Sequence, residues 1–563
     1  MSAQPHAPTE DVAAPLDQLL TQAALGPLRR MFPGSSAIRF VGAMAQRPDR
    51  VATRVGDLLS ELGRVVAGTS EVSAPRSDRR FADPAWQDNA VLHRVMQAYL
   101  AASATAEGIV HDVPMHWRDA ERVSFAVSNL IEALSPTNNP LLSPSAWKSV
   151  IDSGGANVVR GPRNLVHDLA SPPRIPSMVE PDDFTVGTDL AVSPGAVVYR
   201  APMFELIQYA PQTETVREAP LLIIPPTINK FYVLDLAPGR SLVEYLVKQG
   251  QQVFVMSWRN PDARHAKWGF DEYAAAMTEA FDVVTAITKA ESAHVVAACS
   301  GGLIAGLAAA RAAAIGQSGR LASLSLLVTM IDQEHAGVAG SLIDERTARA
   351  AIAKSRRKGY LDGRSLAEVF AWLRPSDLIW NYWVNNYLQG KRPPKFDILF
   401  WNADTTRMTA RLHSDFVDAA LGNKFGKPGA IEVLGTPIDL GQITVDSYVV
   451  AGSADHICPW TNCYTSSQLL GGKVRFVLST NGHIAALVNP PGNPKSSYQV
   501  SDDTTLDVAD WRAAATTESG SWWPDYVAWL ADRSGADIPA PTELGCIEYP
   551  PLEAAPGSYV LDK

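Results

Sequence analysis

The sequence has 563 residues, of which 46% are hydrophobic and 19% charged, and it carries a net charge of −10. This length exceeds what one ordinary core accommodates, so we expect two domains, or one large domain with insertions. The composition is typical of a globular protein, and the acidic balance without any basic run excludes a nucleic-acid partner.

Cysteine usage and the N-terminus point to the cytoplasm. Four cysteines in a chain of this length do not form a disulfide framework, which favours a reducing compartment. The N-terminus, Met1-Ser-Ala-Gln-Pro-His, lacks the basic and apolar regions of a signal peptide. No stretch reaches about 18 uninterrupted apolar residues, so no transmembrane segment is expected.

Residues 1–187 are predicted to form a mainly helical N-terminal domain. Residues 1–15 are rich in Pro, Ala and polar residues, so we expect a disordered start. Ala90–Thr105 and Trp117–Leu134 carry apolar residues at three- and four-residue spacing, which is typical of amphipathic helices. Prolines and acidic residues within 171–187 indicate a linker.

Residues 188–563 are predicted to form an α/β domain, because strand patterns alternate with helical stretches such as Phe270–Lys289 and Leu303–Ala314. This alternation indicates a mostly parallel sheet. The alternation is absent from 332–440, which predicts a cap or lid insertion between two strands. The expected strands are Ala196–Tyr199, Leu221–Ile224, Gln252–Ser257, His294–Ala298, Ala322–Thr329, Asp446–Ala451 and Lys473–Leu478.

The most informative motif is Ala-His-Val-Val-Ala-Ala-Cys-Ser-Gly-Gly at residues 293–302. An apolar run that ends in a nucleophile before a helix is the pattern of a nucleophile elbow, whose tight turn requires small residues two positions before and after the nucleophile. Both Cys299 and Ser300 meet this requirement, so spacing leaves the register open, and a plain turn with an inert cysteine is the alternative. The small residues are Ala297 and Gly301 for the cysteine, and Ala298 and Gly302 for the serine.

An acid and a histidine follow the elbow in the order of the α/β-hydrolase fold. Cys299, Asp455 and His483 each stand just past a predicted strand, where open α/β sheets bind their ligands. The three residues therefore predict a catalytic triad on an α/β-hydrolase fold. His456 is assigned a supporting role, because residues adjacent in sequence rarely share a productive geometry.

An oxyanion hole needs two backbone N–H groups. One is expected from Ser300, directly after the nucleophile. The other is expected from the loop after the strand Leu221–Ile224, where two prolines lack an N–H. Of the three amides that remain, we favour that of Ile228 over those of Thr227 and Asn229.

Cys458 and Cys463 follow no elbow and are expected to be buried thiols. A zinc site of Cys and His residues is a weak alternative, because these two cysteines are five positions apart and no second paired motif accompanies them. The sequence therefore predicts neither a metal nor a cofactor.

Several motifs, in order along the chain, resemble those of the polyhydroxyalkanoate synthases from about Phe81 to the C-terminus. Two of them, Ser193–Val198 and Trp380-Asn-Tyr-Trp-Val-Asn-Asn386, are most similar to the class II, medium-chain members. The others are Leu206-Ile-Gln-Tyr-Ala-Pro211, Pro225-Pro-Thr-Ile-Asn-Lys-Phe-Tyr232, Ser257-Trp-Arg-Asn-Pro261, Cys299-Ser-Gly-Gly, Phe400-Trp-Asn-Ala-Asp-Thr-Thr-Arg407, Asp455-His-Ile-Cys-Pro-Trp460, Gly482-His483-Ile484, Tyr549-Pro-Pro-Leu and Ala555-Pro-Gly-Ser-Tyr-Val. Ala297 and Thr409 depart from the family pattern, where a glycine and a proline are expected.

The resemblance implies Cys299 as the nucleophile, His483 as the general base and Asp455 as its partner, which selects the cysteine register. It also implies an (R)-3-hydroxyacyl-CoA substrate, a growing polyester chain and release of CoA. By the same resemblance we expect a homodimer on cytoplasmic polyester granules, with granule-associated proteins as possible further partners.

Two alternative functions differ from a polymerase in what they require of the triad. A thioesterase or lipase-like hydrolase would use the same triad and release free hydroxyacid. A granule-coating scaffold on an inactive hydrolase fold would need none of Cys299, Asp455 and His483.

Aromatic residues are dense in the insertion, with five among the sixteen positions from Trp372 to Tyr387. They predict either the core of the insertion or an apolar cover over an acyl channel that excludes water. The residues are Trp372, Trp380, Tyr382, Trp383 and Tyr387, with Phe396, Phe400 and Trp401 close behind.

Overall fold

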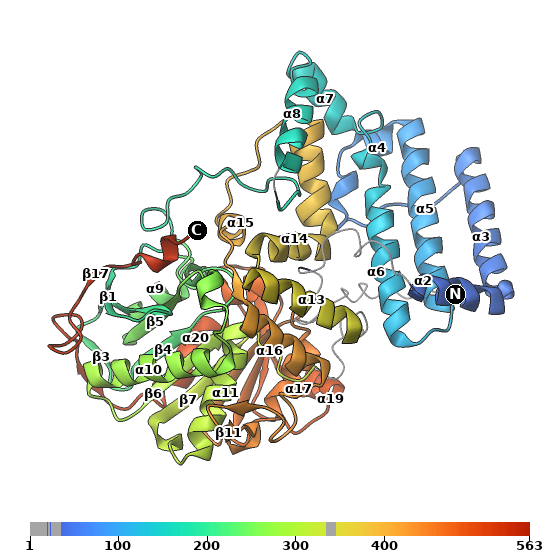
Figure 1. Ribbon diagram of the computed structural model, residues 1–563. Coiled ribbons are helices and arrows are strands. Elements are labelled where there is room, and N and C mark those ends of the chain that lie inside the picture. Colours follow the sequence, from blue (N-terminus) through green and yellow to red (C-terminus); the bar gives the residue numbers. More distant parts are fainter. Residues whose placement is uncertain (1–19, 21–22, 24–34, 171, 334–344) are drawn as a thin grey trace.

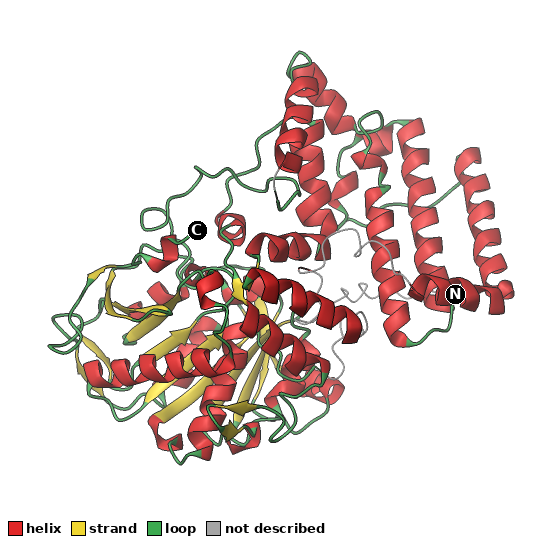
Figure 2. Ribbon diagram, viewed as in Figure 1, coloured by secondary structure: helices red, strands yellow, loops and turns green. Residues whose placement is uncertain are grey.

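The computed structural model describes residues 20, 23, 35–170, 172–333 and 345–563. The segment 1–15, for which disorder is predicted, lies outside these residues. Strands occupy one part of the molecule only, whereas the part that contains the N-terminal segment is helical (Figure 2).

Long helices of the N-terminal segment lie side by side in a layer (Figure 1). Local sequence sets the ends of these helices. At the start of α5 the side chain of Asn89 accepts hydrogen bonds from the amides of Val91 and Leu92, and Gly68 ends α3 in a left-handed conformation. Both helices predicted here are confirmed, and α5 extends further than expected. The helices are α2 (Ser35–Gln46), α3 (Pro48–Ala67), α4 (Ala85–Asp88), α5 (Ala90–Asp112), α6 (Trp117–Ala133), α7 (Pro144–Asp152) and α8 (Asn157–Ala170).

One sheet of eleven strands forms the other part, in the order β15-β14-β13-β12-β7-β6-β4-β5-β2-β1-β17. The six central strands from β13 to β5 are parallel, and β2 runs antiparallel to both of its neighbours. All the strands predicted above are present. Their bounds are β1 (Gly195–Arg200), β2 (Phe204–Tyr209), β4 (Leu221–Ile224), β5 (Val253–Trp258), β6 (Ala293–Ala298), β7 (Leu321–Leu327), β12 (Ser447–Gly452), β13 (Val474–Ser479), β14 (Ser497–Ser501), β15 (Thr516–Ser519) and β17 (Glu553–Ala554).

Helices cover both faces of the sheet, and the central strands are mainly apolar, as this arrangement requires. In β4, for example, Leu222 and Ile224 enter the hydrophobic core beneath α10 and α11, whereas Leu221 and Ile223 enter a second core beneath α9 and α20. The helices on the sheet are α9 (Leu242–Lys248), α10 (Phe270–Thr288), α11 (Ser300–Ala314), α17 (Trp460–Ser467), α18 (His483–Leu487), α19 (Val508–Ala514) and α20 (Trp523–Ala531). This strand order, with helices on both faces, is that of the α/β-hydrolase fold.

The segment between β7 and β12 lies between the sheet and the N-terminal helices in Figure 1. It is mainly helical and is tied to α8: Asn157 donates to the carbonyl of Leu388 at 2.9 Å, and Asn164 to that of Asn386 at 3.1 Å. A Cβ on Gly161 would lie 1.8 Å from the carbonyl oxygen of Tyr387, so only glycine permits this approach. The helices are α13 (Glu345–Lys358), α14 (Gly363–Leu373), η7 (Ser376–Trp380), η8 (Trp383–Leu388), α15 (Asp397–Ala403) and α16 (Ala410–Leu421).

Residues near the end of the chain complete the edge of the sheet at β1. There β17 pairs antiparallel with β1, and the fully buried carboxylate of Glu205 binds Arg200 at 2.7 Å and accepts hydrogen bonds from the amides of Ser558 and Tyr559 at 3.1 and 2.9 Å. This carboxylate therefore joins β2 to a segment that is remote in sequence.

We expect replacement of Glu205 with alanine to lower the free energy of unfolding by about 3 kcal/mol, because it leaves several buried donors without an acceptor. Denaturant unfolding measures the loss. The matched control is Glu553→Ala, which removes a more exposed carboxylate from the same Arg200 and should cost less than about 1 kcal/mol. Equal losses would contradict this account.

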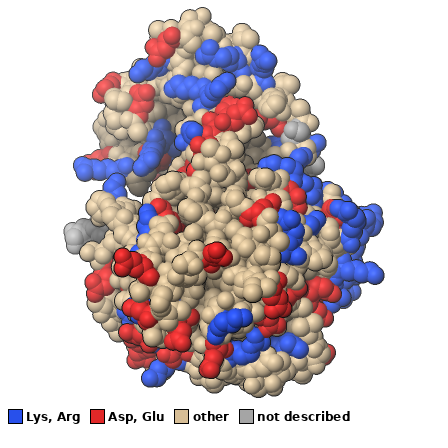
Figure 3. Space-filling model, turned by 90° about the vertical axis from the view of Figure 1, so that its left-hand side faces the viewer, with Lys and Arg blue, Asp and Glu red and all other residues tan. Residues whose placement is uncertain are grey.

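None of the helices in the described part of the chain combines the length and apolar composition of a membrane span. Figure 3 shows one face of the molecule, on which acidic and basic side chains are interspersed around a broad uncharged area. This face therefore lacks the single-signed field of a nucleic-acid surface.

Candidate active site

Cys299 occupies the sharp turn between β6 and α11. Its backbone is at φ 51° and ψ −123°, a strained conformation for a residue other than glycine, and α11 starts at the next residue. Ser300 belongs to the first helical turn and is buried, and its hydroxyl accepts hydrogen bonds from the amide and the hydroxyl of Thr227, both at 3.0 Å. The structure thus puts the cysteine, and not the serine, at the turn that exposes a nucleophile.

Close packing explains the glycines after Cys299: Gly301 meets the backbone of Pro225, and Gly302 meets the side chain of Thr329. A Cβ on Gly301 would lie 2.3 Å from the carbonyl oxygen of Pro225, and one on Gly302 would lie 2.1 Å from the hydroxyl of Thr329. The elbow therefore packs directly against the loop that follows β4.

We expect Gly301→Ala to lower stability by about 1–3 kcal/mol and to reduce activity, because the added methyl group displaces the loop of Pro225. The matched control is Gly306→Ala in the same helix, where the nearest atom would be 3.7 Å away. Alanine should stabilise that position by up to about 1 kcal/mol. Thermal unfolding and activity assays of both variants check the prediction, and destabilisation by both would contradict it.

Asp455 and His483 lie at the ends of neighbouring parallel strands and form a buried pair. His483 Nδ1 lies 2.7 Å from Asp455 Oδ2, and the other carboxylate oxygen accepts from the amides of Ile457 and Cys458 at 2.8 and 2.9 Å. With Nδ1 donating to the carboxylate, the remaining ring nitrogen is the one available to the nucleophile.

The sulfur of Cys299 lies close to this pair. The Sγ atoms of Cys299 and Cys458 and a ring nitrogen of His483 all lie within 4.8 Å of one another. A hydrogen bond from Cys458 and the charge of His483 outweigh burial and hold the pKa of the Cys299 thiol well below its usual value. Burial disfavours a charged imidazole, but Asp455 and Cys299 outweigh it and raise the pKa of His483 to about 10. These shifts favour a thiolate–imidazolium pair.

Cys458 is the residue of the site that sequence reasoning missed. It is buried, as predicted, and Cys463 is as well, but only Cys458 faces the candidate nucleophile. Its position three residues after Asp455 was the available signal, since the loop that delivers the acid delivers this thiol too. Among the described residues, Cys299, Cys458 and His483 form the single cluster whose atoms could hold a metal ion, and a metal there would occupy the candidate nucleophile.

His456 lines the cavity over Cys299 and makes no contact with the carboxylate that holds His483. Burial outweighs the charge of Asp455 and lowers the pKa of His456 to about 4, so its ring is neutral at pH 7. Its Nδ1 is buried without a hydrogen-bond partner among the described residues. The structure therefore places His456 in the wall of the site.

In the loop after β4, the amide of Ile228 meets the expectation for an oxyanion donor. The amide of Thr227 donates to Ser300, and that of Asn229 donates to Thr406 at 2.8 Å. Within the described part of the chain the amide of Ile228 has no partner, and Ile228 lines the same cavity as Cys299. This matches the requirement for a donor left open to a substrate oxygen.

A cavity of about 460 Å³ lies over Cys299 and His483, with a mainly apolar lining. The aromatic residues of the segment between β7 and β12 divide between this cavity and contacts with other aromatic side chains. Tyr382, Phe396 and Trp401 line the cavity, whereas the half-buried Trp380 and Trp383 contact one another edge to face and Phe400 packs on Phe184. Part of the aromatic set thus lines the cavity, and part packs within the segment and against its neighbours.

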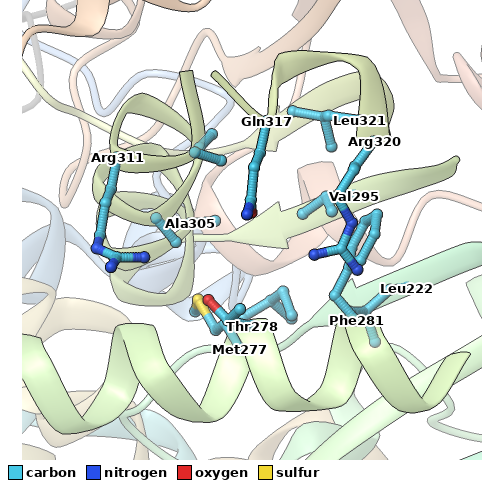
Figure 4. A pocket seen from close by; sticks show the side chains of 14 residues that line it. Leu222, Met277, Thr278, Phe281, Val295, Ala305, Arg311, Gln317, Arg320 and Leu321 are labelled. Atoms are coloured by element: carbon cyan, nitrogen blue, oxygen red, sulfur yellow. The ribbon is translucent and has the colours of Figure 1, made fainter. Parts of the chain in front are cut away.

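A second, smaller cavity of about 80 Å³ lies between α10 and α11 (Figure 4). Met277 and Thr278 bound it on one side, and Arg311 and Gln317 point into it from the other. None of the candidate site residues lines it.

Comparisons with known proteins show the family of this chain. A family model described as the N-terminus of poly-beta-hydroxybutyrate polymerase matches residues 77–246, and one described as the alpha/beta hydrolase fold matches residues 220–490. Poly(3-hydroxyalkanoate) polymerase 1 of Ectopseudomonas oleovorans is 43% identical over 95% of this chain and 96% of its own length. Polymerase 2 of the same organism is 43% identical over 94% of both chains.

More distant similarities extend the comparison. The poly(3-hydroxyalkanoate) polymerase subunit of Cupriavidus necator is 38% identical over 94% of this chain and 91% of its own length. Among solved structures, a hydrolase from Pseudomonas aeruginosa PA01 has 15% identity and a TM-score of 0.32 over 52% of this chain and 92% of that one. A similarity with so low a TM-score carries no argument, so the fold is assigned from the strand order and the family model.

Proposed function

Because this chain belongs to the poly(3-hydroxyalkanoate) polymerase family, we propose that it transfers (R)-3-hydroxyacyl groups from CoA to a growing polyester through a thioester on Cys299. The observation that carries the proposal is the buried Cys299–His483–Asp455 arrangement beneath an apolar cavity. A thiol nucleophile suits this reaction, because exchange of one thioester for another retains the activation of the acyl group.

In the first half-reaction the Cys299 thiolate attacks the carbonyl carbon of the acyl-CoA. The amides of Ser300 and Ile228 stabilise the developing oxyanion in this proposal. The place of Ser300 directly after Cys299 and the unpartnered amide of Ile228 in the cavity wall support this assignment within the described part of the chain. The thioester to Cys299 forms as the carbon–sulfur bond to CoA breaks, and the imidazolium of His483 supplies the proton that the CoA thiolate needs.

In the second half-reaction His483 accepts the proton of the 3-hydroxyl group of an incoming hydroxyacyl-CoA, and the oxygen attacks the thioester carbonyl on Cys299. The ester bond forms as the carbon–sulfur bond to Cys299 breaks, which restores the thiolate–imidazolium pair. Asp455 acts through the imidazole in this proposal. The full burial of its carboxylate, which holds His483 on one oxygen and two amides on the other, supports a positioning and charge-stabilising role.

The segment between β7 and β12 acts as a cap that excludes water, and the apolar cavity takes the acyl side chain. Tyr382, Phe396 and Trp401 support this role because they face the cavity from that segment. The apolar lining also supports a preference for medium-chain monomers. We further propose a homodimer at the surface of polyester granules, which sizing and granule sedimentation would test.

Two substrates separate this function from hydrolysis. With 3-hydroxyacyl-CoAs of graded length, we expect CoA release to match the mass of polymer recovered. With matched acyl-CoAs that lack the 3-hydroxyl, we expect one equivalent of CoA per active site and then no turnover, because the acyl enzyme finds no alcohol. Continued turnover with free acid as product would assign a thioesterase instead.

A further inference from the structure

Two thiols face each other in the site, and the proposed function uses only one of them. Cys299 comes from the elbow after β6 and Cys458 from the loop after β12, and their sulfur atoms lie within 4.8 Å. A disulfide requires about 2.05 Å between the sulfur atoms. Closing the pair therefore takes a movement of at most about 3 Å.

The two thiols differ in protonation. Their mutual hydrogen bond holds the pKa of Cys299 below its usual value and, together with burial, raises that of Cys458. These directions favour the thiolate at Cys299, beside His483, and the protonated thiol at Cys458. A thiolate that is open to small molecules and stands beside a protonated thiol is the arrangement of a redox-sensitive cysteine and its resolving partner.

Backbone contacts fix Cys458 in this orientation. Its amide donates to Asp455 Oδ1 at 2.9 Å, and its carbonyl accepts a contact from the thiol of Cys463 at 3.7 Å. Among the cysteines, Cys299 alone lines the large cavity. A small oxidant that enters the cavity thus meets Cys299 first, with the sulfur of Cys458 within 4.8 Å of that of Cys299.

We propose that Cys458 is a resolving thiol, which converts oxidised Cys299 into a reversible disulfide and so protects the nucleophile from irreversible oxidation. A hydroperoxide transfers one oxygen atom to the Cys299 thiolate, giving a sulfenic acid, and its O–O bond breaks to leave an alcohol or water that takes its proton from His483. The thiol of Cys458 then attacks the sulfenic sulfur, the S–S bond forms, and water leaves. A dithiol restores both cysteines.

This pairing predicts reversible inactivation. While the disulfide exists, Cys299 cannot accept an acyl group. The chemistry depends on the positions of the two sulfur atoms and not on the identity of the acyl substrate, so it can hold or fail independently of the proposed polymerase activity.

The test uses the full chain with Cys463→Ser and Cys546→Ser, which leaves only Cys299 and Cys458. After treatment with hydrogen peroxide, we expect intact mass spectrometry under non-reducing conditions to show the loss of two hydrogens, and dithiothreitol to restore activity. In the matched variant that also carries Cys458→Ser, we expect the mass of two or more added oxygen atoms on Cys299, as in a sulfinic or sulfonic acid, and activity that the reductant no longer restores.

The unmodified sequence provides a second measurement that does not depend on the folding of the variants. Peptide mapping of the peroxide-treated protein should yield a linked pair of peptides that contain Cys299 and Cys458. Added oxygen on Cys299 without such a pair, or a link from Cys299 to Cys463, would overturn the proposal.

Discussion

Replacement of Cys299 with alanine is expected to reduce CoA release and polymer formation by about 10⁴-fold or more, because the sulfur is the atom that receives the acyl group. We expect the turn to tolerate alanine at position 299, because the packing of the elbow depends on the glycines that follow and not on the sulfur. Loss of activity with an unchanged unfolding midpoint is therefore the expected result. Parallel assays of CoA release and polymer mass measure the effect.

Ser300→Ala is the control for this experiment. Ser300 is the neighbouring candidate in the elbow, but its hydroxyl faces Thr227, so we expect this variant to lose stability of about 1 kcal/mol and to retain substantial activity. Mass spectrometry of protein quenched with labelled substrate should place the acyl group on Cys299. An inactive Ser300→Ala together with an active Cys299→Ala would move the nucleophile by one residue.

Asp455→Asn is expected to lower turnover by about 10³–10⁴-fold. The carboxylate orients the ring of His483 and stabilises its charged form, and an amide does neither. Asp446→Asn is the matched control, because Asp446 stands at the opposite end of the same strand, in a partly exposed ion pair with Arg533. We expect that variant to keep nearly full activity.

The same substitution changes the pH dependence of the thiol. In the unmodified protein the pKa of Cys299 is lowered and that of His483 is raised to about 10, so alkylation of Cys299 should be nearly constant across neutral pH. The raised pKa of His483 contributes stability that is fully present below the ordinary imidazole value and is lost as pH rises towards 10. In Asp455→Asn the pKa of His483 falls, and alkylation should become pH-dependent near neutrality. An unchanged profile would contradict the ion pair.

The parallel strands and the residues at their ends could be predicted from sequence because each strand is buried on both faces and so reads as an apolar run. The strands at the edges could not. β14 and β15 are largely polar, and β17 has only two residues, so their pairing depends on neighbours that are distant in the chain. The strand pattern of β2 was visible only as part of a family motif.

The candidate site was partly predictable for a related reason. The ends of the parallel strands bring Cys299, Asp455 and His483 to one edge of the sheet, and this placement does not depend on the conformation of the loops. Contact of Cys458 with Cys299 depends instead on a turn in which Asp455 accepts hydrogen bonds from the two amides that follow His456. Which aromatic residues face the cavity likewise depends on how η7, η8 and α15 and the turns beside them are oriented, which the apolar pattern does not specify.

The contacts of Glu205 have a consequence for synthesis of the protein. During translation β1 and β2 leave the ribosome long before residues 553–559, which cover the outer edge of β1 and supply two amides to the carboxylate. Until then the nascent chain presents an open strand edge and a carboxylate that lacks the amides of Ser558 and Tyr559. The outer edge of the sheet therefore closes only once residues 553–559 have emerged, and β1 depends until then on other protection against pairing with foreign strands.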